Sequence, residues 1–169
     1  GIPFVEGLIK NRYIGRTFIQ PTQKKRDIAV KLKLNPIVSV VKDKDIIMVD
    51  DSIVRGTTSG KIVRMLRKAG AKSIRMCVSS PPIGYPCYYG IDTSVRKELI
   101  AATKTVEEIR EYIKADALHF LSLEGLKASI QSASSDDMCC ACFNNYYPVE
   151  SPKNDTVGAD KYVFEHLKK

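Results

Sequence analysis

The sequence predicts an α/β fold, in which helices flank a mainly parallel β-sheet. Short apolar runs typical of buried strands occur at residues 45–49, 73–79 and 117–121. Apolar residues at helical spacing follow the first two of these runs, at 58–69 and 105–114. Strands that alternate with helices favour parallel pairing, because each parallel connection has to cross from one end of the sheet to the other.

The residues before the first of these runs are predicted to add a strand, a loop and a helix. We expect the strand at 4–9 and a polar, glycine-containing loop at 10–21. A helix is expected at 22–34. It should end near Asn35 and Pro36, because a residue that precedes proline disfavours helical backbone.

The ends of the predicted helices carry their own signals. Gly70 follows the helix at 58–69 and suits the left-handed conformation that closes many helices. Thr105 and Glu108 form the pattern of a capping box at the start of the next helix. A last helix is expected at 123–130, after which the composition becomes polar and irregular.

The composition indicates a globular protein without a membrane span. The chain has 169 residues, of which 44% are apolar and 27% charged, and its formal net charge is +8. No apolar stretch approaches the roughly 18 residues of a membrane-spanning helix. The densest positive charge lies in KNRYIGRTF and QKKR. It favours a small polyphosphate over a nucleic acid, for which neither an RNA-binding motif nor zinc-finger spacing is present.

The segment IIMVDDSIVRGTTSG, residues 46–60, has the pattern of a phosphate-binding site. Asp50 and Asp51 end an apolar strand, and ligands of open α/β sheets bind beyond the carboxyl ends of the strands. The loop at 52–58 leads into a helix, whose first N–H groups and partial positive charge suit an anion. We expect Gly56 to let the backbone approach that anion, and the loop hydroxyls to add donors.

The two carboxylates are expected to bind a group beside the phosphate. Vicinal ribose hydroxyls or a hydrated Mg²⁺ suit Asp50 and Asp51, and a ribose 5-phosphate carries hydroxyls and phosphate on one molecule. A simple Mg²⁺ site is an alternative, as is a purely structural strand and turn in which Asp51 and Ser52 cap the helix.

The five cysteines are Cys77, Cys87 and, close together, Cys139, Cys140 and Cys142. Cys77 lies in an apolar strand and is expected to be a buried core thiol. Cys139 and Cys142 form a CxxC pair, which by itself fits zinc, an iron–sulfur cluster or a redox pair. Cys87 is remote from that pair in the sequence. Neither histidine is expected to be catalytic.

Four motifs together resemble one family of type I phosphoribosyltransferases. IIMVDDSIVRGTTS resembles the motif with which such enzymes bind phosphoribosyl pyrophosphate (PRPP). With GLIKNRYIGRTFIQP, SPPIGYPCYYGID and CCACFNNYYP, the chain is similar to the glutamine PRPP amidotransferases over roughly residues 1–148. The resemblance implies transfer of glutamine-derived ammonia to PRPP. The products are 5-phosphoribosylamine, glutamate and pyrophosphate, in the first step of purine biosynthesis.

The resemblance also implies a role for each residue of the site. Asp50 and Asp51 are expected to bind the ribose hydroxyls and Mg²⁺. Lys10, Tyr13 and Arg16 are expected to belong to a catalytic, flexible loop that closes over PRPP. The implied PRPP-binding residues are Asp50, Asp51, Ser52, Val54, Arg55, Gly56, Thr57 and Thr58.

The iron–sulfur class of the family implies a role for three of the cysteines. Residues that match Cys87, Cys139 and Cys142 hold a structural 4Fe-4S cluster in that class, and its fourth ligand is expected outside this chain. Zinc is the main alternative metal.

The resemblance divides the chain into three regions. Residues 1–132 are expected to form the C-terminal part of the phosphoribosyltransferase domain. Residues 133–148 are expected to form an irregular segment that binds the cluster, and residues 149–169 a polar tail.

The chain is therefore expected to be a fragment that lacks the glutaminase domain and is inactive in isolation. The implied partners are PRPP and ammonia, purine nucleotides as feedback inhibitors, and further copies of the same chain. The expected location is the cytoplasm, with no nucleic-acid or membrane partner. A PRPP-binding regulatory module without catalysis is the alternative, against which the cysteines and KNRYIGRTF argue.

Overall fold

The computed structural model describes residues 1–11, 34–91, 93, 95–130 and 138–149. The strands are β1 (Leu8–Lys10), β2 (Leu34–Pro36), β3 (Asp45–Asp50), β4 (Ser73–Val78) and β5 (Ala117–Phe120). The α-helices are α2 (Val38–Val41), α3 (Thr57–Lys68), α4 (Val106–Ile113), α5 (Leu123–Ser129) and α6 (Ala141–Asn144). Two short 3₁₀ helices, η2 (Arg96–Glu98) and η3 (Ile100–Ala102), precede α4.

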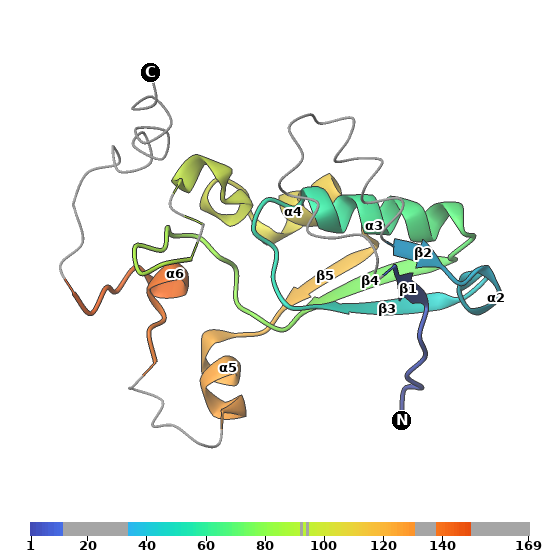
Figure 1. Ribbon diagram of the computed structural model, residues 1–169, viewed down its shortest axis with the longest axis horizontal. Coiled ribbons are helices and arrows are strands. Elements are labelled where there is room, and N and C mark those ends of the chain that lie inside the picture. Colours follow the sequence, from blue (N-terminus) through green and yellow to red (C-terminus); the bar gives the residue numbers. More distant parts are fainter. Residues whose placement is uncertain (12–33, 92, 94, 131–137, 150–169) are drawn as a thin grey trace.

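The strands β3, β4 and β5 form a parallel sheet in that order, whereas β1 and β2 pair antiparallel in a separate sheet. Figure 1 shows α3 and α4 over one face of the parallel sheet. The carboxyl ends of its strands face the side of the molecule where α5 and α6 lie (Figure 1). The predicted parallel α/β fold is therefore confirmed.

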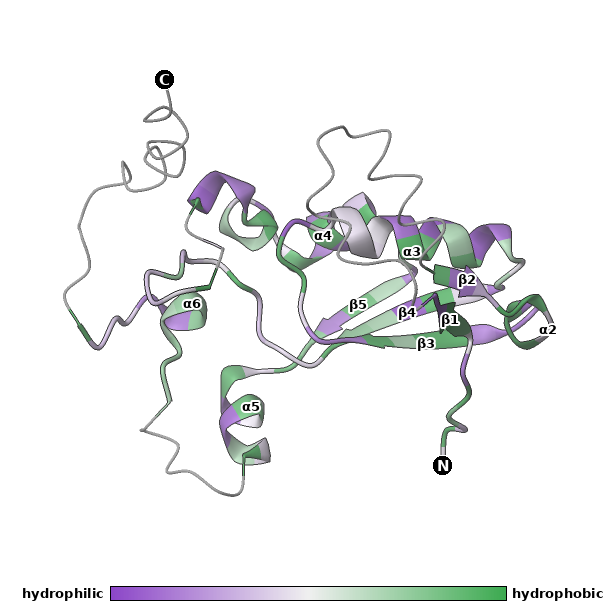
Figure 2. Cartoon of the chain, viewed as in Figure 1, coloured by the Kyte–Doolittle hydropathy of each residue, from purple (hydrophilic) through white to green (hydrophobic). Residues whose placement is uncertain are grey.

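The hydrophobic core lies between the parallel sheet and its two covering helices. In β4, the alternate residues Ile74 and Met76 are fully buried, as the pleat of a strand with one covered face requires. They form one cluster with Val63 of α3 and with Ile109 and Ile113 of α4. Figure 2 shows hydrophobic residues along β3 and β4. Each fully buried aliphatic side chain contributes about 1.5–3 kcal/mol, so this layer stabilises the packing of α3 and α4 on the sheet.

The structure corrects the prediction for the first strand. The strand predicted at 4–9 is instead β1, because pairing with β2 sets its limits, and Phe4 is 93% exposed. Lys10 was predicted to start a loop, but it lies opposite Leu34 in the β1–β2 ladder. Leu34 is therefore a strand residue rather than the end of a helix. The rest of the helix predicted at 22–34 lies outside the described residues.

The other predicted elements are confirmed to within a residue or two at their ends. α3 begins at Thr57 and Gly70 follows it with φ of 94°. The capping box of α4 is present, since the Glu108 N–H donates to Thr105 Oγ1 at 3.3 Å and the Thr105 N–H donates to Glu108 Oε2 at 2.7 Å. Within the described residues, no helix combines the length and the apolar character needed to cross a bilayer.

Candidate functional site

A pocket of about 250 Å³ lies where β3 ends and α3 begins. Every residue that the resemblance assigns to PRPP binding lines it, and Ser59, which the sequence did not single out, lines it as well. The lining residues are Asp50, Asp51, Ser52, Val54, Arg55, Gly56, Thr57, Thr58 and Ser59. A strand end, a short loop and the first turn of a helix thus converge on one small cavity.

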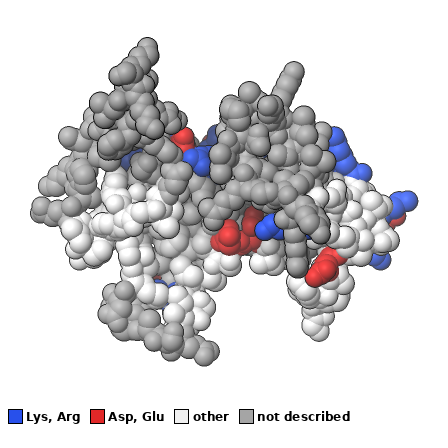
Figure 3. All heavy atoms as spheres, in the orientation of Figure 1, with Lys and Arg blue, Asp and Glu red and all other residues white. Residues whose placement is uncertain are grey.

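The two carboxylates of the pocket differ in their surroundings. Asp50 is half-buried, and this burial raises the pKa of its carboxyl group. Its Oδ1 accepts a hydrogen bond from the Asp51 N–H at 3.1 Å. Asp51 is exposed, and its Oδ1 accepts from the Ser52 hydroxyl at 2.8 Å. Figure 3 shows acidic side chains gathered near the middle of the face it presents, beside a basic one.

The N-terminus of α3 supplies hydrogen-bond donors to the same pocket. The first bond within the helix runs from the Gly60 N–H to the Gly56 carbonyl at 2.9 Å. Among the described residues, no side chain caps this end of the helix. The N–H groups of Thr57, Thr58 and Ser59 are therefore left to a ligand, at the positive end of the helix dipole, where an anion is stabilised.

The backbone conformation and the packing around Gly56 both require glycine, and its expected role in the close approach of the backbone to an anion stays a prediction. Its φ of 70° lies in the left-handed region. A Cβ atom there would lie 2.9 Å from Ile100 Cδ1 and 3.1 Å from Tyr112 Cε1. The turn into α3 is thus pressed against η3 and α4, and only a residue without a side chain fits.

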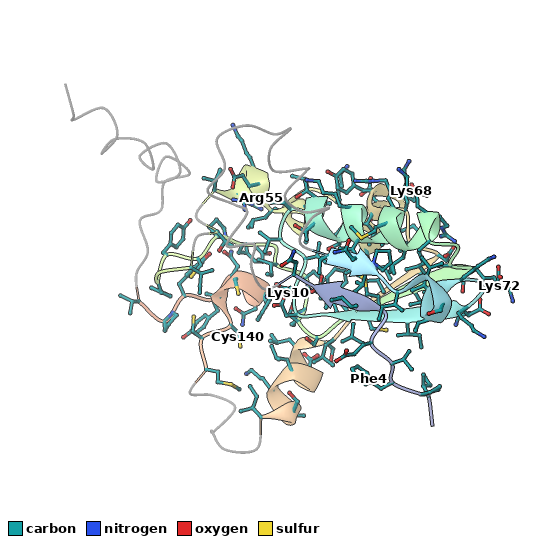
Figure 4. The ribbon with its side chains drawn as sticks, turned by 45° about the vertical axis from the view of Figure 1, so that its right-hand side comes forward. Phe4, Lys10, Arg55, Lys68, Lys72 and Cys140 are labelled. Carbon is teal, nitrogen blue, oxygen red and sulfur yellow. The ribbon has the colours of Figure 1, made fainter. Side chains whose placement is uncertain are left out.

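The segment that carries η2 and η3 is hydrogen-bonded to the loop between β3 and α3. The Ile100 N–H donates to the Val54 carbonyl at 2.9 Å. Arg55 Nε donates to Glu98 Oε2 at 3.0 Å, and Arg55 Nη2 donates to the same oxygen. Figure 4 shows Arg55 beside the short helical turns of this segment. Sequence reasoning missed these contacts, because no local pattern links residues so far apart.

The residues predicted to form the closing loop are described only in part. Lys10 ends β1, and Figure 4 shows it at the tip of that strand. Tyr13 and Arg16 lie outside the described residues. Their role above the pocket therefore stays a prediction.

Comparison with known proteins shows which family the chain is similar to. The chain is 54% identical over 167 residues to an amidophosphoribosyltransferase of Synechocystis, and covers 33% of it. It is 56% identical over 153 residues to the amidophosphoribosyltransferase of Bacillus subtilis, and covers 32% of it. These matches span 99% and 89% of the chain. Along about nine tenths of its length or more, the chain is homologous to amidophosphoribosyltransferases. No model of a protein family matches it.

Solved structures of the amidophosphoribosyltransferase family share the fold. One is the glutamine PRPP amidotransferase of Bacillus subtilis in complex with ADP and GMP, with a TM-score of 0.78 and 54% identity. A second, described as the allosteric regulatory enzyme of purine biosynthesis, has a TM-score of 0.77 and 53% identity. The two matches cover 90% and 91% of this chain, and this chain covers 34% of each solved chain. The predicted fold class is confirmed, and the chain spans about a third of its relatives.

The structure also brings the cysteines of interest together. Both the Gly84 and the Tyr85 N–H donate to the Cys142 carbonyl at 3.1 Å, which joins the loop of Cys87 to α6. Burial raises the pKa of Cys142, and the nearby thiols of Cys87, Cys139 and Cys140 raise it further. Among the described residues, however, no three metal-ligating side chains are arranged to hold an ion.

The tyrosines of this region hold its two segments together. The Tyr147 hydroxyl donates to the Pro86 carbonyl at 2.7 Å, and its ring lies 5.1 Å from that of Tyr88. Burial, with nearby Tyr88, raises the pKa of Tyr147 to about 12. Cys140 is buried and Cys139 is exposed. Figure 4 shows Cys140 at α6. Cys77 is half-buried and lies outside the core cluster, so the expectation of a buried core thiol is wrong, because its side chain lies on the face of the sheet away from Ile74 and Met76.

The raised pKa of Asp50 predicts a stability effect. Burial makes the ionised form of Asp50 less favourable in the folded state. Its contribution is present at low pH and is lost as pH rises through the raised pKa. Asp50→Asn, which keeps the acceptor for Asp51, is therefore expected to increase the free energy of unfolding at pH 7. The gain should vanish below about pH 4.

Urea unfolding at a series of pH values measures this gain. Asp45→Asn is the matched control at the other end of β3. Hydrogen bonds from Ser73 and Lys72 lower the pKa of Asp45, so this substitution should lower stability at neutral pH. A shift of the same sign for both variants would contradict the burial argument.

Proposed function

We propose that the protein is an amidophosphoribosyltransferase, which joins glutamine-derived ammonia to PRPP and releases pyrophosphate. The product is 5-phosphoribosylamine, for the first step of purine biosynthesis. The observation that carries this proposal is the pocket itself, in which paired carboxylates and an uncapped helix N-terminus lie side by side. The identity of 54% and 56% with amidophosphoribosyltransferases along most of the chain supports it.

The pocket would divide the substrate between its two sides. The 5-phosphate would accept hydrogen bonds from the N–H groups at the start of α3 and from the hydroxyls of Thr57 and Thr58. The ribose hydroxyls would donate to Asp50 and Asp51. A sugar held at both ends presents its anomeric carbon in a fixed direction, and such positioning lowers the barrier to attack by ammonia.

The carboxylates suit Mg²⁺ by their chemistry. Mg²⁺ is usually held by one or two carboxylates together with phosphate oxygens of a substrate. Asp50 and Asp51 would hold the ion, which when bound neutralises charge on the departing pyrophosphate.

The loop that follows Lys10, the last residue of β1, would complete the site. Positive charge develops at the anomeric carbon as pyrophosphate leaves, so water has to be kept away until ammonia reacts. We assign this closure to the loop with Lys10, Tyr13 and Arg16, whose cationic groups would also stabilise the leaving pyrophosphate. The support is the position of Lys10 at the tip of β1.

Purine nucleotides are the regulators that we propose. A solved relative of the family carries ADP and GMP, and an end product of the pathway is an effective inhibitor of its first step. Assembly with further copies of the chain and a cytoplasmic location stay predictions, as does the division at residues 132 and 148.

A turnover assay tests the proposed function. The full-length protein, given PRPP, Mg²⁺ and ammonium, should release pyrophosphate and form phosphoribosylamine. Binding of PRPP without turnover would instead support the regulatory module. An absence of PRPP binding would contradict both.

We further propose that Cys87, Cys139 and Cys142 contribute thiolate ligands to a 4Fe-4S cluster, with a fourth ligand from outside this chain. Thiolates are the donors that such clusters require. The support is that the loop of Cys87 is hydrogen-bonded to the segment of Cys142. The cluster would be structural, joining α6 to the loop before η2, and zinc is the alternative.

Substitution of the cysteines is expected to separate the ligands from the other thiols. In protein purified without oxygen, Cys87→Ser and Cys142→Ser should each remove the bound iron and the absorbance at about 400 nm. Cys77→Ser is the control. Cys77 lies within β4, so this substitution should leave iron and sulfide unchanged. Stoichiometric zinc without iron would contradict the cluster.

A further inference from the structure

The pocket contains an arginine that is already bound to a carboxylate. Arg55 is part of the pocket lining, yet its Nε and Nη2 both donate to one oxygen of Glu98. The two side chains are 40% and 44% exposed, so the pair lies at the surface rather than in the core. Arg55 lines the pocket whereas Glu98 does not, so a ligand in the pocket would meet the arginine of the pair.

Glu98 is fixed relative to the pocket by contacts that do not involve Arg55. Two residues further on, the Ile100 N–H donates to the Val54 carbonyl at 2.9 Å. The side chain of Ile100 also packs under Gly56, where an added Cβ would meet its Cδ1 at 2.9 Å. The backbone on both sides of Arg55 is thus fastened to the segment that carries Glu98. The pair is therefore a built part of the loop.

We infer that Glu98 is an internal competitor for the ligand phosphate, which it opposes by holding the guanidinium of Arg55. This inference rests on the proposed function. A guanidinium has donors for two partners, but Glu98 neutralises its charge and directs it along η2. A phosphate dianion has to draw Arg55 from Glu98 or share it. Exposed ion pairs are weak, so the competition lowers affinity without preventing binding and favours product release.

Glu98 acts through Arg55 and is therefore a positioning residue. If it only repelled the phosphate through space, its effect would not depend on Arg55. If it only stabilised the loop, its removal would weaken binding. Competition for the guanidinium is the case in which removal of the carboxylate tightens binding and does so only while Arg55 is present.

A double-mutant cycle tests this inference by calorimetric titration of the purified protein with ribose 5-phosphate and Mg²⁺. Glu98→Gln is expected to tighten binding by about two- to fivefold, the range of an exposed ion pair. In the Arg55→Gln background, Glu98→Gln should change nothing. Glu107→Gln is the matched control, because Glu107 pairs with Arg110 in α4, away from the pocket.

The outcomes separate the inference from the proposed function. If the unaltered protein binds ribose 5-phosphate and Glu98→Gln binds it equally or more weakly, the inference is wrong and the proposed function stands. The same holds if Glu98→Gln tightens binding equally with and without Arg55. If the unaltered protein does not bind ribose 5-phosphate, the proposed function fails and the inference fails with it.

Discussion

Asp51→Asn in the full-length protein is expected to reduce phosphoribosylamine formation by about ten- to a hundredfold. The exposed Asp51 carboxylate is the charged acceptor that the pocket offers to a ribose hydroxyl. Loss of a hydrogen bond to a charged group costs about 1.5–3 kcal/mol, and each 1.4 kcal/mol is about tenfold in rate. Asparagine keeps an oxygen for the Ser52 hydroxyl, so the loop should stay folded.

Steady-state assays with varied PRPP measure this loss. Asp45→Asn again serves as the control, since Asp45 lies in the same strand but at its amino end and does not line the pocket. It should keep full activity. Unchanged rate and PRPP affinity in Asp51→Asn would show that the ribose lies elsewhere.

Gly56→Ala is expected to destabilise the fold by about 2–4 kcal/mol, combining left-handed backbone and overpacking. The φ of Gly56 is 70°. The new methyl group would lie 2.9 Å from Ile100 Cδ1 and 3.1 Å from Tyr112 Cε1, closer than van der Waals contact. Because this turn sets the direction of α3, phosphate binding should weaken as well. Denaturant unfolding and ribose 5-phosphate titration measure the two effects.

Ile100→Val separates the two causes of that loss. Valine lacks the Cδ1 atom that an alanine at position 56 would touch at 2.9 Å. In the double variant, Gly56→Ala should therefore cost less than it does alone, with the costs of the left-handed φ and of the contact with Tyr112 remaining. An equal cost in both backgrounds would mean that the contact with Ile100 does not contribute.

Much of the fold followed from local patterns. The apolar runs of β3, β4 and β5 have the length and composition of strands, although no residue of β3 is fully buried and its Val49 is 71% exposed. The capping box of α4 needs residues only three apart. The pocket was predictable for the same reason. Asp50 to Thr58 are consecutive, so one strand end and one helix start bring them together without any distant contact.

The features that sequence reasoning missed depend on distant pairing. β1 and β2 are three residues each, and their limits are set by one another rather than by their own composition. Leucine is a residue type that favours helices, yet pairing with Lys10 places Leu34 in a strand. The ion pair of Arg55 with Glu98 and the contact of Gly56 with Ile100 join segments more than forty residues apart. The buried Ser59 was missed because burial was not apparent from its type.

The most direct test of the central claim is the position of a ribose 5-phosphate on the protein. Backbone ¹H–¹⁵N spectra of the purified protein, recorded during titration with ribose 5-phosphate and Mg²⁺, report on each N–H group separately. The account predicts the largest shift changes at Thr57, Thr58 and Ser59, with smaller ones at Asp50 and Asp51. Changes centred elsewhere, or none at saturating ligand, would contradict the assignment of this pocket to the phosphate.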